Sequence, residues 1–350
     1  MTDVLLGGAS LVLLVLTVLP LSGNPAWWVR GPEFPRLQLA LIAALLLVLQ
    51  GLLFDFSGLV QTLVFYVTLG IALYQAWWIL PYTALWAAEV KRATNSGRTG
   101  QVRILTANVL MSNRESEGLL RQVREHVPDV LITLESDEWW EAQFAELLPE
   151  YPHTISCPLD NTYGMHLWSR FPLEAVSVDY LVESDVPSFH ALIRLPCGTG
   201  VRTHVLHPAP PAPQENEGSA ERDAELVIVA KSLENNDQPT IVTGDLNDVA
   251  WSRTTRLFRQ LSGLLDPRIG RGLFNTYNAF HWFARWPLDH IFHSPHFRLQ
   301  EIQRLEAFGS DHFPLFTVLQ YQPALASEQP ALEADREDHE LADSLVDRVS

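Results

Sequence analysis

Three long apolar runs occupy most of the first 90 residues and limit the folds open to this chain. They cover residues 4–21, 37–54 and 59–80, and none contains a charged side chain. A bilayer core about 30 Å thick is crossed by a helix of about 20 apolar residues. We therefore expect three transmembrane helices, and residues 1–90 are predicted to be a membrane anchor.

Aromatic residues flank these runs. Trp27 and Trp28 lie between the first two, and a larger group (Trp77, Trp78, Tyr82, Trp86) follows the third. Amphipathic rings favour the bilayer interface, so this placement supports membrane spans. The alternative for the first run is a cleaved signal peptide. No basic residue precedes the run and no small-x-small cleavage site ends it, which favours a retained helix.

Basic residues predict the orientation. Arg30 and Arg36 lie between the first two runs, and Lys91, Arg92 and Arg98 follow the third. Three spans place both groups on one side of the membrane. The positive-inside rule then predicts a cytoplasmic location for the following domain. A different number of spans would place that domain in the periplasm or outside the cell.

Net charge bears on the partners of the remaining chain. The chain has a net charge of −17, and residues after 90 account for −15 of it. Broad capture of nucleic acid requires a basic surface, so this balance argues against it. Five arginines could still form a local basic patch or hold a compact phosphate: Arg253, Arg256, Arg259, Arg268 and Arg271. Cys157 and Cys197 form no C-x-x-C pattern, and the sequence leaves their pairing open.

The chain after the anchor divides into three parts. Residues 91–101, which include Asn95-Ser96-Gly97, are expected to be a linker. Residues 102–321 are expected to form a catalytic domain, and the acidic residues 322–350 a disordered tail. Buried strands are predicted at 102–109, 130–134, 165–169, 190–195, 201–207, 240–243, 288–293 and 313–319, and helices at 115–126, 138–148, 220–234 and 252–261. This alternation predicts an α/β fold with sheets covered by helices.

Polar residues recur where these strands end. Glu135 ends one apolar run, Gly244-Asp245-Leu246-Asn247 ends another, and Ser310-Asp311-His312 precedes a third. Carboxylates that bind a metal, together with an oriented imidazole, are the equipment for water attack on a phosphate ester. Taken singly, each has a simpler explanation, such as a helix-start charge for Glu135 or an Asx turn for Asp245.

The pair Asp311 and His312 cannot serve each other easily. Adjacent side chains on extended backbone point to opposite faces, so His312 needs another carboxylate. Asp289 is the most economical partner, and Asp311 is left to face a metal. His207, which precedes Pro208, could donate a hydrogen bond to a phosphate or a proton to a leaving group.

The ordered set of Asn108, Glu135, His207, Asp245, Asn247, Asp289, Asp311 and His312 resembles the endonuclease/exonuclease/phosphatase superfamily, which includes deoxyribonuclease I and sphingomyelinases. The resemblance covers residues 102–320. It implies a four-layer α/β sandwich, with two packed mixed sheets flanked by helices, and Mg²⁺ or Mn²⁺ as the cofactor. The anchor makes the chain similar to the bacterial inner-membrane branch that includes VanJ-like proteins.

The resemblance also implies roles. Glu135, Asn108 and Asp311 would lie at the metal. Asp245 would orient or deprotonate water, Asn247 would support the phosphoryl oxygens, and Asp289 would activate His312. His207 matches the histidine of a Leu-His-x-Ala-Pro segment, and Tyr163 and Asn108 would contact the substrate phosphate.

Three functions follow from this reading. The first is a metal-dependent phosphoesterase that acts on a lipid phosphate or pyrophosphate at the bilayer. The second is a membrane-tethered nuclease. The third, a non-catalytic scaffold, is disfavoured because the acid, amide and imidazole groups are all retained.

Overall fold

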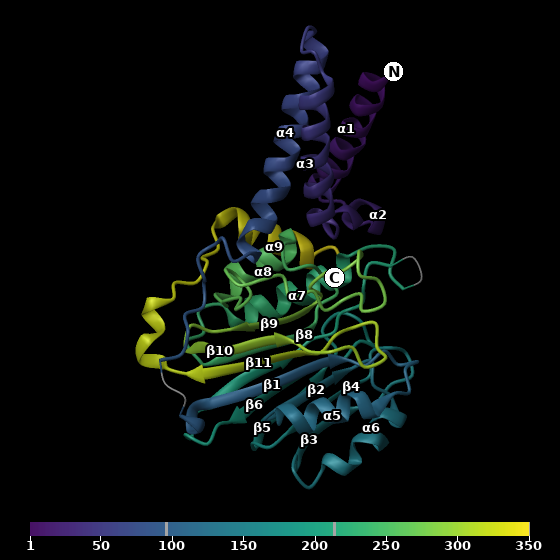
Figure 1. The fold of residues 1–350 in the computed structure, drawn as a ribbon. Helices are drawn as coiled ribbons and strands as arrows, with labels where there is room; N and C mark the ends of the chain where they lie inside the picture. Colours follow the sequence, from purple (N-terminus) through teal and green to yellow (C-terminus); the bar gives the residue numbers. More distant parts are fainter. Residues whose placement is uncertain (95–96, 213–214, 350) are drawn as a thin grey trace.

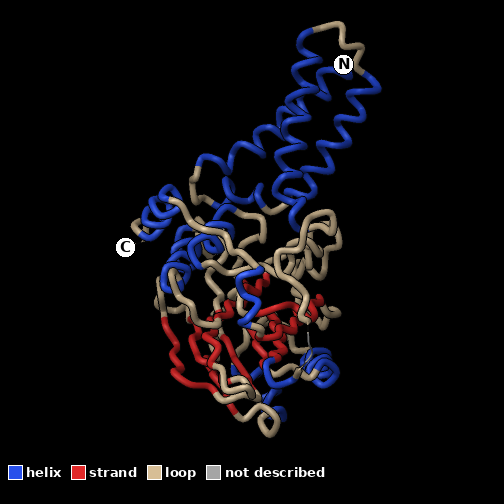
Figure 2. Tube along the Cα trace, turned by 90° about the vertical axis from the view of Figure 1, so that its left-hand side faces the viewer, coloured by secondary structure: helices blue, strands red, loops and turns tan. Residues whose placement is uncertain are grey.

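A computed structural model describes residues 1–94, 97–212 and 215–349 (Figure 1). Its N-terminal part contains three helices that are long and apolar enough to cross a membrane, within Thr2–Ser22, Arg36–Leu53 and Leu59–Tyr82. They stand side by side and project away from the rest of the molecule (Figures 1 and 2). The helical elements of this part are α1 (Thr2–Val18), η1 (Leu19–Ser22), α2 (Trp27–Arg30), η2 (Gly31–Glu33), α3 (Arg36–Leu53), α4 (Leu59–Ile79) and η3 (Leu80–Tyr82).

The remaining chain is built on two mixed sheets. The first has the strand order β10-β11-β1-β2-β4-β3 and the second β5-β6-β7-β8-β9. Within them β1 pairs with β2, and β7 with β8, in parallel. The strands are β1 (Gln101–Asn108), β2 (Val130–Leu134), β3 (His153–Cys157), β4 (Met165–Ser169), β5 (Leu173–Asp179), β6 (Ser188–Arg194), β7 (Gly200–Val205), β8 (Thr240–Asp245), β9 (Asp289–His293), β10 (Phe297–Arg304) and β11 (Leu315–Tyr321).

Helices cover the outer face of each sheet. One hydrophobic cluster fills the space between the sheets, a second lies under α5 and α6, and a third under α7, α8 and α9. This confirms the predicted four-layer α/β sandwich. The helical elements are η4 (Arg98–Gly100), α5 (Ser116–His126), α6 (Glu138–Phe144), η5 (Ala145–Leu147), α7 (Ala220–Leu233), α8 (Arg253–Ser262), η6 (Pro323–Glu328) and α9 (Arg336–Val346).

Strands buried on both faces were the easiest to predict. Every residue of β2, β4 and β8 is buried, so each is a short apolar run bounded by turn residues. The prediction missed β3, β5 and β10, which are edge strands or lie beside an exposed face. Their mixed polarity carries no clear period-2 signal.

The N-terminal helices pack directly onto the domain built on the two sheets. The guanidinium of Arg30 contacts Glu33 at 2.8 Å, and the carboxylate of Asp223 in α7 lies 4.0 Å from it. The indole of Trp251 donates to the carbonyl of Glu33 at 2.9 Å. All four side chains are buried. Such contacts orient the two parts relative to each other beyond the covalent connection.

The structure describes most of the predicted linker and tail. Of the predicted linker, Asn95 and Ser96 lie outside the described residues, but Ala93 donates to the carbonyl of Leu299 in β10. The tail, expected to be disordered, instead contains α9, which begins with a capping box at Asp335. Its Leu345 and Ala342 are buried against α7 and α8, because the helix has one apolar stripe despite its acidic composition.

We predict that Glu225 makes stability depend on pH. This residue of α7 is 2% exposed, and burial raises the pKa of its carboxyl from 4.5 to about 8, with nearby Glu183 adding to the effect. The folded state therefore holds a proton that the unfolded chain releases above its ordinary pKa. Stability should fall as pH rises from about 4.5 to about 8, by a few kcal/mol in total.

Glu225→Gln should lose less stability than wild type between pH 5 and 9, measured as the thermal unfolding midpoint in detergent. Glu221→Gln, one turn earlier on α7 and accessible to solvent, is the control. Equal pH dependence in Glu225→Gln and wild type would contradict the prediction.

Candidate active site

The ends of three strands bring the first polar group together. Asn108 ends β1, Glu135 follows β2, and Asp245 ends β8 in the opposite sheet. The amide nitrogen of Asn108 donates to Glu135 at 2.7 Å and to Asp245 at 3.1 Å. One amide therefore joins carboxylates from both sheets. The parallel pairing of β1 with β2 brings Asn108 and Glu135 to the same sheet edge.

An imidazole between two carboxylates forms the second group. Nδ1 of His312 lies 2.8 Å from Asp289, and its Nε2 lies 3.5 Å from Asp245. The Oγ of Ser310 accepts from the His312 backbone N–H and donates to the carbonyl of Asn108. The Ser-Asp-His segment is thus attached to the end of β1. The predicted pairing of His312 with Asp289 is present in the structure.

A tight turn places Asp245 and Asn247. Gly244 has φ of 141°, and a Cβ there would lie 2.0 Å from the carbonyl oxygen of Leu206, so only glycine fits. After it, the Asn247 N–H donates to Asp245 at 2.9 Å, and the Asn247 amide donates to the carbonyl of Pro208. The Asx turn and the proposed site are therefore one structure, not alternatives.

His207 and Tyr163 lie beside this group. His207 is 2% exposed, its Nδ1 has no partner among the described residues, and burial lowers its pKa to about 4. The Tyr163 ring packs against it with centroids 5.6 Å apart. The Tyr163 hydroxyl donates to Glu215, so it is engaged away from the other site residues. Its contact with a substrate phosphate stays a prediction.

The electrostatics of the site are dominated by acids, of which Asp245 and Asp289 are buried and Glu135 and Asp311 half-buried. Burial raises the pKa of Glu135 to about 7, and it also raises the pKa values of Asp311 and Asp289. Burial lowers the pKa of His312, but Asp289 and Asp245 outweigh it and raise the value to about 10. Four carboxylates thus surround one imidazolium, which leaves excess negative charge in the site.

Comparison with known proteins decides the family. Residues 105–312 match the model of the endonuclease/exonuclease/phosphatase family, which is more than half of the chain. The chain belongs to this family. Members of the endonuclease/exonuclease/phosphatase family are metal-dependent phosphoesterases, and the protein is an enzyme of that class. No curated protein matches the chain significantly.

Solved structures agree with the family fold. D. rerio TDP2 complexed with a single-strand DNA product shares 15% identity at a TM-score of 0.52, over 63% of this chain and 99% of that one. A family protein from Bacteroides thetaiotaomicron shares 21% identity at a TM-score of 0.51, over 63% of this chain and 98% of that one. The human nocturnin catalytic domain with bound sulfate shares 18% identity at a TM-score of 0.50, over 64% of this chain and 96% of that one. At these identities the likeness shows the fold.

The donor set fits the divalent metal that the family uses. Carboxylate and amide oxygens are ligands that Mg²⁺ and Mn²⁺ prefer. Oδ1 of Asp311 and Oδ1 of Asp289 are buried without a hydrogen-bond partner among the described residues. One atom from each of Asp245, Asp289 and His312 also lies within 4.8 Å of the others. These three side chains are a second possible set of metal ligands. The orphaned oxygens and the excess negative charge both suit a cation.

Sequence reasoning missed several residues that shape the site. The Tyr277 ring packs on His312 with centroids 5.0 Å apart, and the Asp289 backbone N–H donates to Thr276. Arg222, fully buried, donates to the Asn247 carbonyl and pairs with Asp248 at 3.4 Å. An arginine in an apolar helix face was the only signal for Arg222. Nothing in the sequence pointed to Tyr277 or Thr276.

The five arginines considered for a basic patch do not form one. Arg268 is fully buried against Asp266 at 2.8 Å, and Arg259 pairs with Glu89. Arg271 donates to backbone carbonyls. Arg253 and Arg256 alone among the five are exposed. This leaves no broad phosphate-binding surface in that segment.

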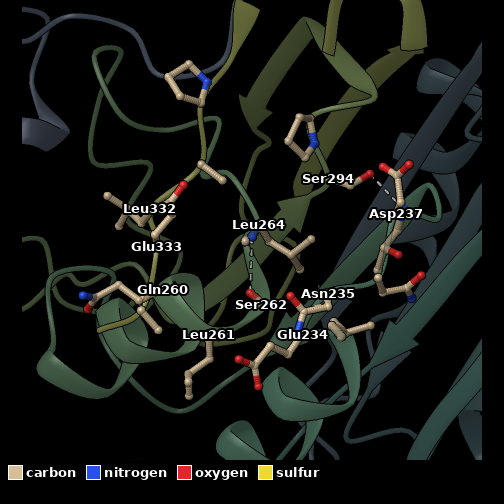
Figure 3. A pocket seen from close by; sticks show the side chains of 18 of the residues that line it. Glu234, Asn235, Asp237, Gln260, Leu261, Ser262, Leu264, Ser294, Leu332 and Glu333 are labelled. Carbon is tan, nitrogen blue, oxygen red and sulfur yellow. Dashed lines mark hydrogen bonds between the residues drawn. The ribbon is translucent and has the colours of Figure 1, made fainter. Parts of the chain in front are cut away.

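A cavity of about 670 Å³ lies away from the site, between the ends of α7 and α8 and the C-terminal segment (Figure 3). Its lining includes Glu234, Gln260, Ser262 and Asp237, and contains none of the predicted site residues. Cys157 and Cys197, whose pairing the sequence left open, are both free thiols.

Proposed function

We propose that this protein is a membrane-anchored phosphoesterase that uses Mg²⁺ or Mn²⁺ to hydrolyse a phosphate ester or pyrophosphate of a lipid headgroup. The observation that carries the lipid substrate is an exposed aromatic loop that joins the active site to the anchor. Its tip holds Phe280, Trp282 and Phe283, which are 59%, 81% and 62% exposed. Soluble proteins rarely expose so many large rings together.

The aromatic loop contacts both the active site and the membrane anchor. At the active site, the Ala279 N–H donates to the carbonyl of Asp311, and Tyr277 lies on His312. At the anchor, the amide of Gln38 in the first turn of α3 donates to the carbonyl of Phe283 at 2.9 Å. Because α3 is a candidate span, these rings lie where a bilayer surface would begin, next to the reacting groups.

The chemistry proposed for the site follows from its geometry. Asp289 holds Nδ1 of His312, so Nε2 faces the space beside Asp245, where it can exchange a proton with the reacting oxygen. Burial raises the pKa of Asp245, but the charge of His312 and hydrogen bonds from Asn247 and Asn108 together lower it, which keeps Asp245 ionised to orient and deprotonate water. Asn247 and the neutral ring of His207 would donate hydrogen bonds to phosphoryl oxygens.

The metal would be held by Glu135, Asp311 and Asn108, and would neutralise charge on the phosphate. The resemblance to the VanJ-like branch and the location in a bacterial inner membrane belong to the same proposal. So does a cytoplasmic catalytic domain, which rests on the positive-inside pattern of Arg30, Arg36 and Lys91.

The test is release of phosphate from isoprenoid and glycerophospholipid phosphates in detergent, with and without Mg²⁺. Plasmid DNA is assayed in parallel. We expect Mg²⁺-dependent release from at least one lipid phosphate. DNA nicking without lipid turnover would instead establish the alternative, a membrane-tethered nuclease, and would contradict the lipid proposal.

We predict that the aromatic loop affects lipid substrates selectively. Replacing Trp282 and Phe283 with alanine removes the two ring systems nearest the tip, and should lower turnover of lipid phosphate in vesicles about tenfold. Turnover of a small soluble phosphodiester should stay within twofold, because neither ring touches His312 or Asp245. Tyr180→Ala, an exposed aromatic of the domain outside this loop, is the control. Equal losses on both substrates would mean that the loop supports the site itself.

A further inference from the structure

A second cavity, of about 530 Å³, lies where α4 meets the catalytic domain. It is lined by Trp77 and Trp78 from the end of α4, by Trp86, and by Arg256 and Arg259 of α8. Figure 1 shows the lower end of α4 close to α8. None of the proposed active-site residues lines this cavity. Its size is in the range of pockets that hold small molecules.

One wall of the cavity is aromatic and open to the surroundings of α4. Trp77 is 61% exposed and Trp86 40%, and their rings meet edge to face at 6.4 Å between centroids. Tryptophan at the end of a membrane span favours the interface between hydrocarbon and headgroups. The cavity is therefore continuous with the surface that α4 would present to lipid.

Several side chains that line the cavity carry hydrogen-bond donors without acceptors. Arg256 forms no ion pair within the described part of the chain, and its guanidinium lies 6.0 Å from the ring centroid of Trp78. Arg259 is 5% exposed, and its Nε lacks a partner among the described residues although its other end pairs with Glu89. Nε1 of Trp78 is likewise buried without an acceptor. Nε of Arg259 and Nε1 of Trp78 are buried donors without an acceptor, which costs free energy, and Arg256 adds an exposed positive charge. These side chains therefore suit an anionic ligand.

The carboxylates of the cavity are already neutralised. Glu89 is bound by Arg259 and by the N–H of Asp266. Glu328 is bound by Arg298 and lies 3.4 Å from the amine of Lys91. Neither therefore cancels the free charge of Arg256.

We propose that this cavity binds one anionic glycerophospholipid, separately from the catalytic site. Its phosphate would lie on Arg256 and Arg259, and its acyl chain would lie along Trp77 and Trp86. A charged headgroup joined to an apolar chain matches a cavity lined both by unpaired donors and by aromatic rings. The bound lipid would hold α8 against α4 and so orient the catalytic domain at the bilayer.

The test uses the full chain, purified in detergent and titrated with phosphatidylglycerol or phosphatidylcholine, with bound lipid counted by native mass spectrometry. We expect one phosphatidylglycerol to be retained in preference to phosphatidylcholine. Arg256→Gln should weaken this retention about tenfold, since a charge-assisted hydrogen bond is lost. Trp86→Ala should weaken retention of both lipids.

Arg253→Gln is the matched control, because Arg253 is exposed on the same helix, three residues earlier, and does not line the cavity. It should retain lipid as wild type does. Equal retention of the two lipids by wild type would overturn the proposal, as would wild-type retention by Arg256→Gln. Displacement of the lipid by millimolar inorganic phosphate would show a plain anion site and would also overturn it. Because the readout is binding, failure here is distinct from failure of the proposed hydrolysis.

Discussion

Replacing His312 with alanine is expected to lower phosphate-ester hydrolysis about 10³-fold. The imidazole is placed beside Asp245 to exchange a proton with a reacting oxygen, and such transfer typically contributes 10²- to 10⁴-fold. Asp289→Asn should lower the rate of hydrolysis by a similar factor. Nδ1 of His312 lies 2.8 Å from that carboxylate and depends on it for orientation. The measurement is kcat on the substrate identified by phosphate release.

Two controls separate chemistry from folding. His153→Ala changes a half-buried histidine of edge strand β3, which pairs with Ser169 at the end of the sheet away from Glu135, and should keep wild-type kcat. The thermal unfolding midpoint of Asp289→Asn should remain near that of wild type, since asparagine keeps the shape of the side chain. Full activity in His312→Ala would refute the proposed proton transfer.

Glu135→Gln is expected to weaken binding of Mn²⁺ about 10²-fold or more, and to lower activity in parallel at fixed metal concentration. Loss of partners that merely orient metal ligands costs 10- to 100-fold in affinity, and removal of a charged ligand should cost at least as much. Mn²⁺ binding can be followed by electron paramagnetic resonance, which does not depend on turnover. Raising the metal concentration should restore part of the activity.

The neighbouring Glu138→Gln provides the comparison. Glu138 is exposed at the start of α6 and should leave Mn²⁺ affinity unchanged. If Glu135→Gln bound Mn²⁺ like wild type, while Asp245→Asn or Asp289→Asn did not, the metal would belong to the Asp245, Asp289 and His312 group instead. That result would correct the proposed ligand set without changing the reaction class.

The part of the fold that could be predicted follows from burial on both faces. Strands such as β2 and β8 are continuous apolar runs, and the polar residue that ends each run, Glu135 or Asp245, marks the sheet edge where the site forms. The pairing of His312 with Asp289 was also predictable, because the alternating directions of side chains excluded Asp311. These signals are local, so a single sequence contains them.

Other parts of the site depend on contacts between distant segments. The tail helix α9 is ordered because Leu345 is buried against α7, more than a hundred residues earlier. Arg268 looked free to hold phosphate, yet Asp266 and His290 surround it. The aromatic loop became informative once Gln38 was seen to contact Phe283.

The sequence by itself determined three apolar spans, the alternation of strands and helices, and the order of the acid, amide and imidazole residues. Hydrophobic periodicity and side-chain alternation carry that information along neighbouring residues. The tertiary structure alone decided that Asn108 bridges Glu135 and Asp245, that Tyr277 packs on His312, and which arginines stay free. These depend on the packing of the two sheets and the N-terminal helices, which brings together residues that no local pattern relates.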